Sequence, residues 1–294
     1  MLLIFIVFSL ASQLSQAICE CGYKTANGLL WTHTLNSDFT APSMTNVTYS
    51  SFSSQWTISN WSNGNVAAGN RTVTIGRQFL PQNVYFQNKS LNLKVSAYTG
   101  RGKILCGEIS TVRADILYGS FRSTFKVQPV SGACAGFFYY YVWINNNPEL
   151  IGQNDTQEID VEILTKDPTT RAVHYTQQPI VRGSQFTNVL PNPWTNFVRY
   201  RFDWLPKSST FFADGQRERT IRVNTEHTPG TVKLNMWSNG NTLWSAGPPT
   251  QDAIMSVQNT CFFFNVSEDL KNLPTSEFNT ACSAHRVPVC KVLD

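Results

Sequence analysis

The sequence is poor in charged residues, which make up 14% of its 294 positions, and long amphipathic helical patterns are hard to find in it. Both absences disfavour a cytosolic helical protein. The net charge of +4 comes from scattered basic residues, so no basic stripe points to a nucleic-acid partner. After the first ten residues no apolar run approaches the ~20 residues that span a bilayer. We therefore expect a soluble mature protein, with no membrane contact once its leader is removed, that acts as a monomer.

Aromatic residues are abundant instead, at 13%, and short apolar runs recur between Gly, Pro, Asn and Asp. This pattern predicts many short strands and an all-β fold, a sandwich or jelly roll. No repeat or linker divides residues 18–294, which indicates one domain. A polar stretch at residues 145–155 is predicted to be a loop at the rim of the site. The predicted strands are Val73–Ile75, Leu91–Val95, Tyr118–Val127, Phe137–Ile144, Val198–Trp204, Thr210–Ala213 and Thr231–Trp237.

Residues 1–17 have the pattern of a signal peptide. An apolar stretch from Leu2 to Leu10 is followed by small residues up to Ala17, where signal peptidase would cut. Six Asn-X-Ser/Thr sequons agree with export, since one or two arise by chance but six suggest a glycoprotein. We expect a protein secreted to the extracellular space or the cell wall. The sequons begin at Asn46, Asn60, Asn70, Asn88, Asn154 and Asn265.

All seven cysteines lie beyond the predicted leader, so in an oxidising compartment they are expected to pair and leave one over. Their spacing matches no zinc pattern, and we expect neither a metal site nor a cofactor. Cys282 and Cys290 are close enough in sequence for a local bridge. The other cysteines, Cys19, Cys21, Cys106, Cys134 and Cys261, have no assigned partner.

The run from Gln157 to Ile163 carries the clearest functional signal. Glu158, Asp160 and Glu162 alternate with β-branched aliphatic residues, the pattern of a half-buried strand, so the three acids share one face. Like charges this close repel, and no Lys or Arg lies within the run. An ordinary solvated acidic face and a cation site remain the alternatives. Acid/base chemistry is the favoured interpretation.

Two carboxyls on one face suit glycoside hydrolysis, in which one acid protonates the leaving oxygen and the other attacks or activates water. Cα atoms four residues apart on a flat strand lie ~13 Å apart, so inward-leaning side chains on a concave sheet must close the gap. The charge of Asp160, between the glutamates, is expected to help keep one of them protonated. Aromatic residues cluster before and after the run, and their flat faces suit sugars.

These residues resemble glycoside hydrolase family 16, retaining jelly-roll enzymes that act on β-glucan. The family motif Glu-X-Asp-X-Glu matches Glu158 to Glu162. The resemblance implies that Glu158 is the nucleophile, Asp160 the assisting acid and Glu162 the acid/base. It covers about residues 91–264, while the cysteine-containing terminal segments fall outside it. It also implies a concanavalin A-like sandwich with a concave substrate cleft, and substrate-binding roles for Arg113, Tyr140, His174, Tyr175, Trp204, Trp237 and Asn239.

Four functions remain open at this point. The leading one is an endo-β-1,3(4)-glucanase-like hydrolase that acts through a covalent glycosyl-enzyme. The second is a transglycosylase of cell-wall glucan or chitin that uses the same residues. The third is a non-catalytic lectin on the same sandwich, and the fourth is a structural wall glycoprotein. Neither of these last two explains the repulsion among three acids.

Overall fold

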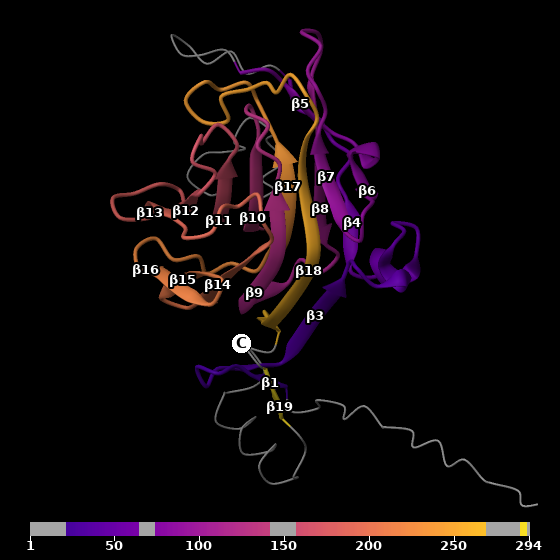
Figure 1. Cartoon of the computed structure of the whole chain (residues 1–294). Coiled ribbons are helices and arrows are strands. Elements are labelled where there is room, and N and C mark those ends of the chain that lie inside the picture. The colour runs from indigo at the N-terminus through magenta and orange to yellow at the C-terminus, as the bar shows by residue number, and fades with distance from the viewer. Residues whose placement is uncertain (1–21, 65–73, 142–156, 269–288, 293–294) are drawn as a thin grey trace, which may run out of the picture.

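The computed structural model describes residues 22–64, 74–141, 157–268 and 289–292. Several expectations fall outside these ranges: the signal peptide, the loop at residues 145–155, two sequons and three cysteines, namely Asn70, Asn154, Cys19, Cys21 and Cys282. Within them the chain is almost entirely β-structure in two large sheets packed face to face (Figure 1). The predicted all-β jelly-roll sandwich is confirmed.

The first sheet, which we call the cleft sheet, has eight strands in the described part of the chain. Its order is β13-β12-β11-β10-β17-β8-β4, and β5 pairs with β8 in parallel. Its strands are β4 (Trp56–Ile58), β5 (Arg77–Phe79), β8 (Ile104–Thr111), β10 (Cys134–Tyr141), β11 (Gln157–Leu164), β12 (Ala172–Gln178), β13 (Gln185–Val189) and β17 (Thr231–Trp237).

The second sheet, which we call the outer sheet, also has eight strands among the described residues, in the order β16-β15-β14-β9-β18-β7-β6 with β3 on β18. They are β3 (His33–Asp38), β6 (Val84–Phe86), β7 (Leu91–Val95), β9 (Ile116–Val127), β14 (Val198–Leu205), β15 (Ser208–Ala213), β16 (Gln216–Ile221) and β18 (Ala253–Val266).

A small sheet joins the two ends of the described chain in the order β19-β1-β2 (Figure 1). Helical structure in the described residues is limited to short turns. The remaining elements are β1 (Tyr23–Lys24), β2 (Leu30–Trp31), β19 (Cys290–Lys291), α1 (Ser50–Ser53), η1 (Pro42–Met44) and η2 (Pro81–Asn83).

The core lies between the two large sheets and is rich in aromatic rings. Phe137 of β10 packs against Phe202 of β14 with 5.1 Å between ring centroids, and Phe202 in turn contacts Phe121 of β9 at 4.9 Å. All three side chains are fully buried. Each large aromatic residue buries about 150–250 Å², so these contacts fix the two sheets together and leave the opposite face of the cleft sheet for the site.

The predicted strands agree well with the observed ones. Leu91–Val95 and Thr231–Trp237 match β7 and β17 residue for residue. The predicted strand Val73–Ile75 is wrong in its described part, because the strand in this region is β5, which begins at Arg77. Ile75 instead donates its backbone N–H to the carbonyl of Asn239, 2.8 Å away, in the loop after β17.

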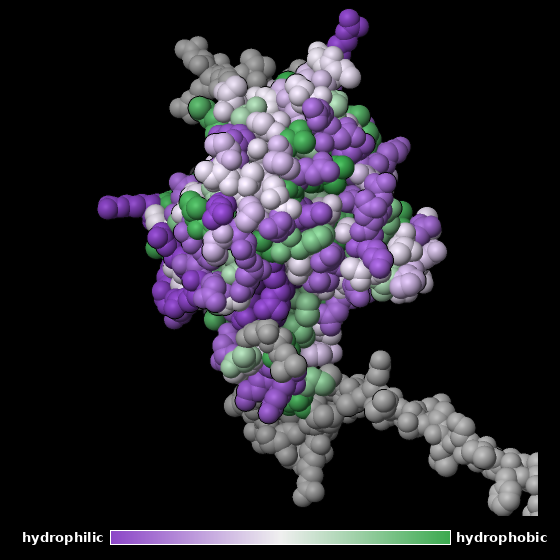
Figure 2. Space-filling view, in the orientation of Figure 1, coloured by the Kyte–Doolittle hydropathy of each residue, from purple (hydrophilic) through white to green (hydrophobic). Residues whose placement is uncertain are grey.

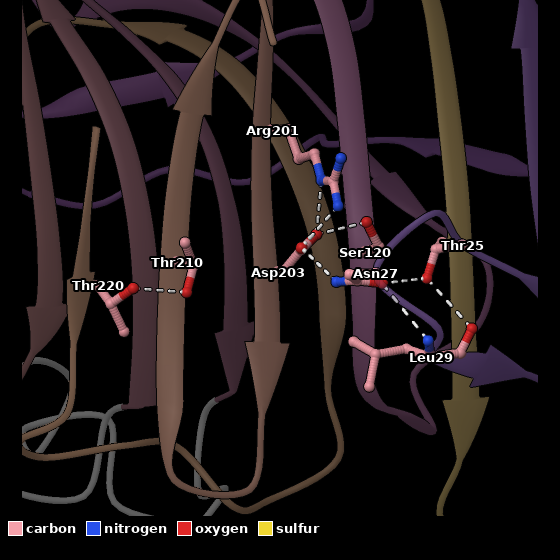
Figure 3. A network of polar contacts seen from close by, with 8 residues as sticks. All are labelled: Thr25, Asn27, Leu29, Ser120, Arg201, Asp203, Thr210 and Thr220. Atoms are coloured by element: carbon pink, nitrogen blue, oxygen red, sulfur yellow. Dashed lines mark hydrogen bonds and ion pairs between the residues drawn. The ribbon is translucent and has the colours of Figure 1, made fainter. Parts of the chain in front are cut away.

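Asp203 anchors the N-terminal region on the outer sheet (Figure 3). Its carboxylate accepts two bonds from the Arg201 guanidinium, at 2.8 and 2.7 Å, and one from the Ser120 hydroxyl. Asn27 donates to the same carboxylate at 3.5 Å. A buried, bidentate pair of this kind is a strong charge-assisted interaction, and it lies away from the cleft sheet.

The face shown in Figure 2 is mostly polar, with hydrophobic residues in small separate areas. Asn46, Asn60 and Asn88 are exposed, while Asn265 is partly buried on β18, where its side-chain amide oxygen accepts the Thr32 N–H at 3.0 Å. Glycosylation at these sites stays a prediction. Among the described residues, no helix is both long enough and apolar enough to span a bilayer.

The expectation that only one cysteine is unpaired is wrong. Cys106, Cys134 and Cys261 are all free. They lie on three different strands, β8, β10 and β18, and two of them are completely buried. Cys290 is disulfide-bonded, and since the other described cysteines are free, its partner lies outside the described residues. The predicted bridge to Cys282 therefore stays a prediction.

Candidate active site

The alternating run forms β11, as predicted, and its two faces differ as expected. Ile159, Val161 and Ile163 have no exposed surface and lie in the core. Because successive side chains of a strand point to opposite faces, the three acids lie on the other face of the cleft sheet. β10 and β12 flank β11 on either side, so the acids stand at the middle of the sheet rather than at its edge.

A cavity of about 390 Å³ opens over these acids. Its floor comes from β11, β10, β17 and β8, and its rim includes aromatic residues from outside these strands. The lining residues are Trp61, Arg77, Phe79, Glu108, Gly136, Phe138, Tyr140, Glu158, Asp160, Glu162, Gln178, Ile180, Lys233, Asn235, Trp237 and Trp244.

The three carboxyl groups share fewer than three negative charges. Burial, and after it the charges of Glu158 and Glu162, raises the pKa of Asp160 well above its ordinary value. Asp160 donates a hydrogen bond to Glu158. Burial and the charge of Glu162 raise the pKa of Glu158 to about 8, and the bond from Asp160 opposes that rise. The raised pKa favours the protonated form of Asp160, which is 3% exposed, over the negative charge expected from the sequence.

Glu162 is surrounded by hydrogen-bond donors. Burial raises its pKa, while bonds from Cys134, Trp244 and Trp237 lower it. The Cys134 thiol donates to Glu162 Oε1 at 3.2 Å. A carboxyl whose proton affinity is raised by burial and moderated by donors suits a group that must give up and take back a proton near neutral pH.

A polar cluster forms the floor on the other side of β10. Glu108 on β8 accepts bonds from Lys233 at 3.3 Å, Asn235 at 3.1 Å and Ser59 at 2.7 Å. Glu108 is only 3% exposed, and these bonds satisfy its buried charge. Lys233 is thereby held near the acids, where its positive charge lowers the pKa of Glu158.

Two aromatic residues that the resemblance implied do line the cavity. Tyr140 lies directly opposite Glu158 on β10, and the Lys233 ammonium is 5.1 Å from the centre of its ring. Trp237 ends β17, is partly exposed and packs on the core with its inner edge. Both rings therefore line the cavity.

Tyr175 and Trp204 are not in the cavity, and the expectation of substrate contact is wrong for both. Neither has any exposed surface. Tyr175 pairs across the sheet with Val161 and therefore points into the core, where it stacks on Phe186 at 4.6 Å. Trp204 belongs to the outer sheet and packs against Tyr139, with 4.1 Å between ring centroids.

Arg113 and Asn239 also lie outside the cavity lining. Arg113 follows the end of β8 and pairs with Asp115 at 2.6 Å. The amide oxygen of Asn239 accepts the N–H of Asn241, at 3.1 Å, within the loop that leads to Trp244. Both side chains take part in local structure, and substrate contact by these two residues stays a prediction.

His174 lies beside the site rather than in it. It is the cross-strand neighbour of Glu162 on β12, and its ring contacts that of Trp244 at 5.3 Å. Thr187 holds its Nδ1 at 2.9 Å. Burial, and then the charge of Lys166, lowers the pKa of His174. A neutral imidazole here supports the position of Trp244.

Sequence reasoning missed several cavity residues because they reach it from distant segments. Arg77 comes from β5, which joins the sheet through a parallel pairing with β8. Trp61 precedes it on a loop and stacks on Phe79 at 4.7 Å. Asn235, and Cys134 next to the cavity, could have been found from the period of two along β17 and β10, since they share a face with Trp237 and Tyr140.

The arrangement matches a known family. The family model of glycosyl hydrolases family 16 matches residues 60–255 of the chain. This chain belongs to glycosyl hydrolases family 16. The matched region includes β11 and nearly every strand of the cleft sheet, so the family-16 motif and the observed cavity coincide.

Known proteins similar to this family-16 chain include bacterial beta-glucanases. The beta-glucanase of Acetivibrio thermocellus is 28% identical over 186 residues, which are 63% of this chain and 51% of that protein. The beta-glucanase of Paenibacillus polymyxa is 30% identical over 157 residues, 53% of this chain and 62% of that protein. The chain thus spans about half the length of the first of these relatives.

Solved structures share the fold. A native glycosidic hydrolase superposes with a TM-score of 0.62 at 23% identity, covering 78% of this chain and 95% of the other. The Bacillus licheniformis beta-glucanase gives 0.59 at 20% identity, covering 78% and 97%. The Crh5 transglycosylase without ligand gives 0.54 at 18% identity, covering 78% and 83%. Because these identities are below 25%, the superpositions show a shared fold and nothing further about this family-16 chain.

Proposed function

We propose that this chain is a retaining glycoside hydrolase that cleaves β-glucan through a covalent glycosyl-enzyme. The observation that carries the proposal is the placement of Glu158, Asp160 and Glu162 on the floor of one cavity, with Asp160 donating to Glu158. Family membership and the relatives named beta-glucanase support the substrate class.

In the first step the Glu158 carboxylate attacks the anomeric carbon as its bond to the leaving oxygen breaks. Glu162 gives its proton to that oxygen, so the leaving sugar departs as an alcohol. The hydrogen bond from Asp160 keeps Glu158 oriented and favours its charged form. The product is an ester between Glu158 and the sugar.

In the second step Glu162, now a carboxylate, takes a proton from water. The oxygen of that water attacks the anomeric carbon, and the ester bond to Glu158 breaks. Two displacements at one carbon restore its original configuration. Glu158 ends as a carboxylate and Glu162 as an acid, which returns both groups to their starting state.

The test is incubation of the purified chain with a panel of β-glucans and chitin, with products resolved by size. Shorter oligosaccharides with retained anomeric configuration are expected from β-1,3- or mixed-linkage glucan. Intact polymers in every sample, with a correctly folded protein, would contradict the hydrolase proposal and favour a lectin, which a binding isotherm on the same glucans would then reveal.

Transglycosylation is the second outcome of the same assay, because an acceptor hydroxyl can replace water in the second step. The cavity has apolar and aromatic rim residues, Trp61 being 44% and Ile180 55% exposed, where an acceptor sugar could lie. Adding a labelled oligosaccharide distinguishes the two reactions. Label in products longer than the acceptor indicates a transglycosylase.

Secretion and N-glycosylation belong to the same proposal. Residues 1–17 resemble a leader, and the sequon asparagines Asn46, Asn60 and Asn88 are exposed. Expression in a eukaryotic secretory host should place the protein in the medium or the wall, as a monomer whose gel mobility rises after deglycosylation. An unchanged band would contradict the glycoprotein part.

A further inference from the structure

Cys134 is a buried thiol directed at Glu162, which lines the cavity, rather than into the hydrophobic core cluster. It begins β10, has no exposed surface, and its thiol donates to Glu162 Oε1 at 3.2 Å. Cys106, which is buried to the same extent on β8, lies in the core instead. Its thiol points at the backbone carbonyls of Ile104 and Ser238, 3.6 and 3.9 Å away. Two buried cysteines thus have different chemical partners.

The register of the sheet explains why Cys134 reaches Glu162. The residue directly opposite Glu162 on β10 is Gly136, which offers no side chain. A Cβ at Gly136 would lie 2.6 Å from the amide oxygen of Asn235, so any side chain here would force Asn235 or β10 to shift. The diagonal neighbour two residues along the strand is Cys134, and diagonal pairs on one face are within contact range. Cys134 is therefore the side chain through which β10 holds Glu162.

We propose that Cys134 is a positioning residue for Glu162, whose thiol hydrogen bond fixes the acid/base carboxyl and sets how readily it gives up its proton. This inference rests on the proposed glycosidase function. Cys134 contacts Glu162 and acts on the reaction through it.

The chemistry of a thiol fits this role. Burial, and then the charge of Glu162, raises the pKa of Cys134 well above its ordinary value, so the thiol stays protonated and remains a donor. An S–H group is a weak donor. It orients Glu162 without stabilising the carboxylate so strongly that the proton is lost before the first step. A hydroxyl in the same place would be a stronger donor, and a methyl group would be none.

Other groups besides Cys134 also face Glu162. Glu158 and Asp160 flank it on β11, His174 lies across from it on β12, and the charge of Arg77 on β5 lowers its pKa. Trp237 and Trp244 donate to it. Trp244 also bonds to Cys134, so replacing Cys134 removes one donor to Glu162 and one partner of Trp244.

The experiment compares Cys134→Ala, Cys134→Ser and the matched control Cys106→Ala in the full chain. The measurement is kcat/KM against pH on the glucan that wild type cleaves, with folded protein checked by a melting curve. The alkaline limb reports Glu162, which must be protonated to donate. Loss of a donor to the carboxylate raises its pKa, so Cys134→Ala should move this limb upward by roughly half a pH unit or more. Cys134→Ser should move it downward, and Cys106→Ala should leave it in place.

The outcomes separate this inference from the proposed function. The positioning role would be overturned if the alkaline limb of kcat/KM stayed in place in both Cys134 variants, or if it shifted equally in Cys106→Ala. Either result would leave the hydrolase proposal intact. If wild type cleaves no glycan, the proposed function fails, and the hydrogen bond is then tested by NMR titration of ¹³C-labelled glutamate. The Glu162 carboxyl should still titrate higher in Cys134→Ala than in wild type, and identical titrations would overturn the inference. If Cys134→Ala does not fold, Cys134→Ser alone carries the comparison.

Discussion

The guanidinium carbon of Arg77 lies 4.8 Å from the centre of the Trp237 ring. One face of Trp237 is therefore covered by a cation held on β5, while its indole donates to Glu162. Cation–π contacts of this kind contribute ~0.5–1 kcal/mol at exposed sites and more when desolvated. Trp237 thus connects the rim of the cavity to the acid/base carboxyl, a role that differs from that of a simple sugar platform.

Replacing Trp237 with Ala should therefore reduce kcat/KM at least tenfold while costing less stability than loss of a core tryptophan. Its side chain is partly exposed, so the loss of unfolding free energy should stay below the ~3–5 kcal/mol expected for a buried aromatic residue. The matched control is Trp204→Ala, which removes a tryptophan with no exposed surface. Rates and urea unfolding curves are measured on both. A large stability loss in Trp237→Ala with normal activity of the folded fraction would place Trp237 in the core.

Glu158→Gln should remove at least 99% of turnover and leave the fold intact, because the amide keeps the shape of the side chain but cannot attack the anomeric carbon. Glu218→Gln is the control: it makes the same change at a glutamate on β16 of the outer sheet, outside the cavity lining. Its rate should stay within about threefold of wild type. Retention of a tenth of the wild-type rate in Glu158→Gln would disprove the nucleophile assignment.

The acidic strand shows what sequence alone can predict. Alternation placed Glu158, Asp160 and Glu162 on one face, and the complete burial of Val161 between them confirms it. The period of two is a property of any strand and needs no knowledge of the partner strands.

The site residues that were predicted wrongly or missed share one physical cause. The face of the sheet to which a side chain points depends on the register of its strand and on which sheet that strand joins. Tyr175 points to the core because its cross-strand partner is Val161, and neither periodicity nor composition gives that pairing. Trp204 is buried because β14 lies in the outer sheet. Arg77 enters the cavity through a parallel pairing that brings β5 beside β8, a long-range contact that no local pattern encodes.

Stability should fall as pH rises from about 5 to 8. Burial raises the pKa of Glu226 to about 8 in the folded state, against about 4.3 in an unfolded chain. Between these values the folded state binds more protons than the unfolded state, so unfolding becomes easier as pH increases. The stabilisation is complete below the unfolded pKa and is lost through the folded one.

Glu226→Gln should flatten this dependence, because the amide does not titrate. Urea unfolding at pH 5 and pH 8 gives the measurement, and the variant should lose less stability across this range than wild type, by on the order of 2–4 kcal/mol. Parallel curves for the two proteins would show that Glu226 is not protonated in the folded state at neutral pH.

Gly136→Ala should disturb the site from the strand beside the acids. A Cβ there would lie 2.6 Å from the amide oxygen of Asn235, whose nitrogen is held by Glu108 at 3.1 Å. Because that amide is anchored, the clash must be relieved by breaking the bond to Glu108 or by shifting β10, which carries Cys134 and Tyr140. We expect a loss of about 1–3 kcal/mol in unfolding free energy and a fall in kcat of tenfold or more.

Gly64→Ala, where a Cβ meets nothing within 4 Å, is the control and should change neither quantity. Adding Asn235→Ala to Gly136→Ala should recover part of the stability, because the clashing oxygen is gone. If the double variant instead loses the sum of the unfolding free energies lost by the two single variants, the two residues do not contact each other.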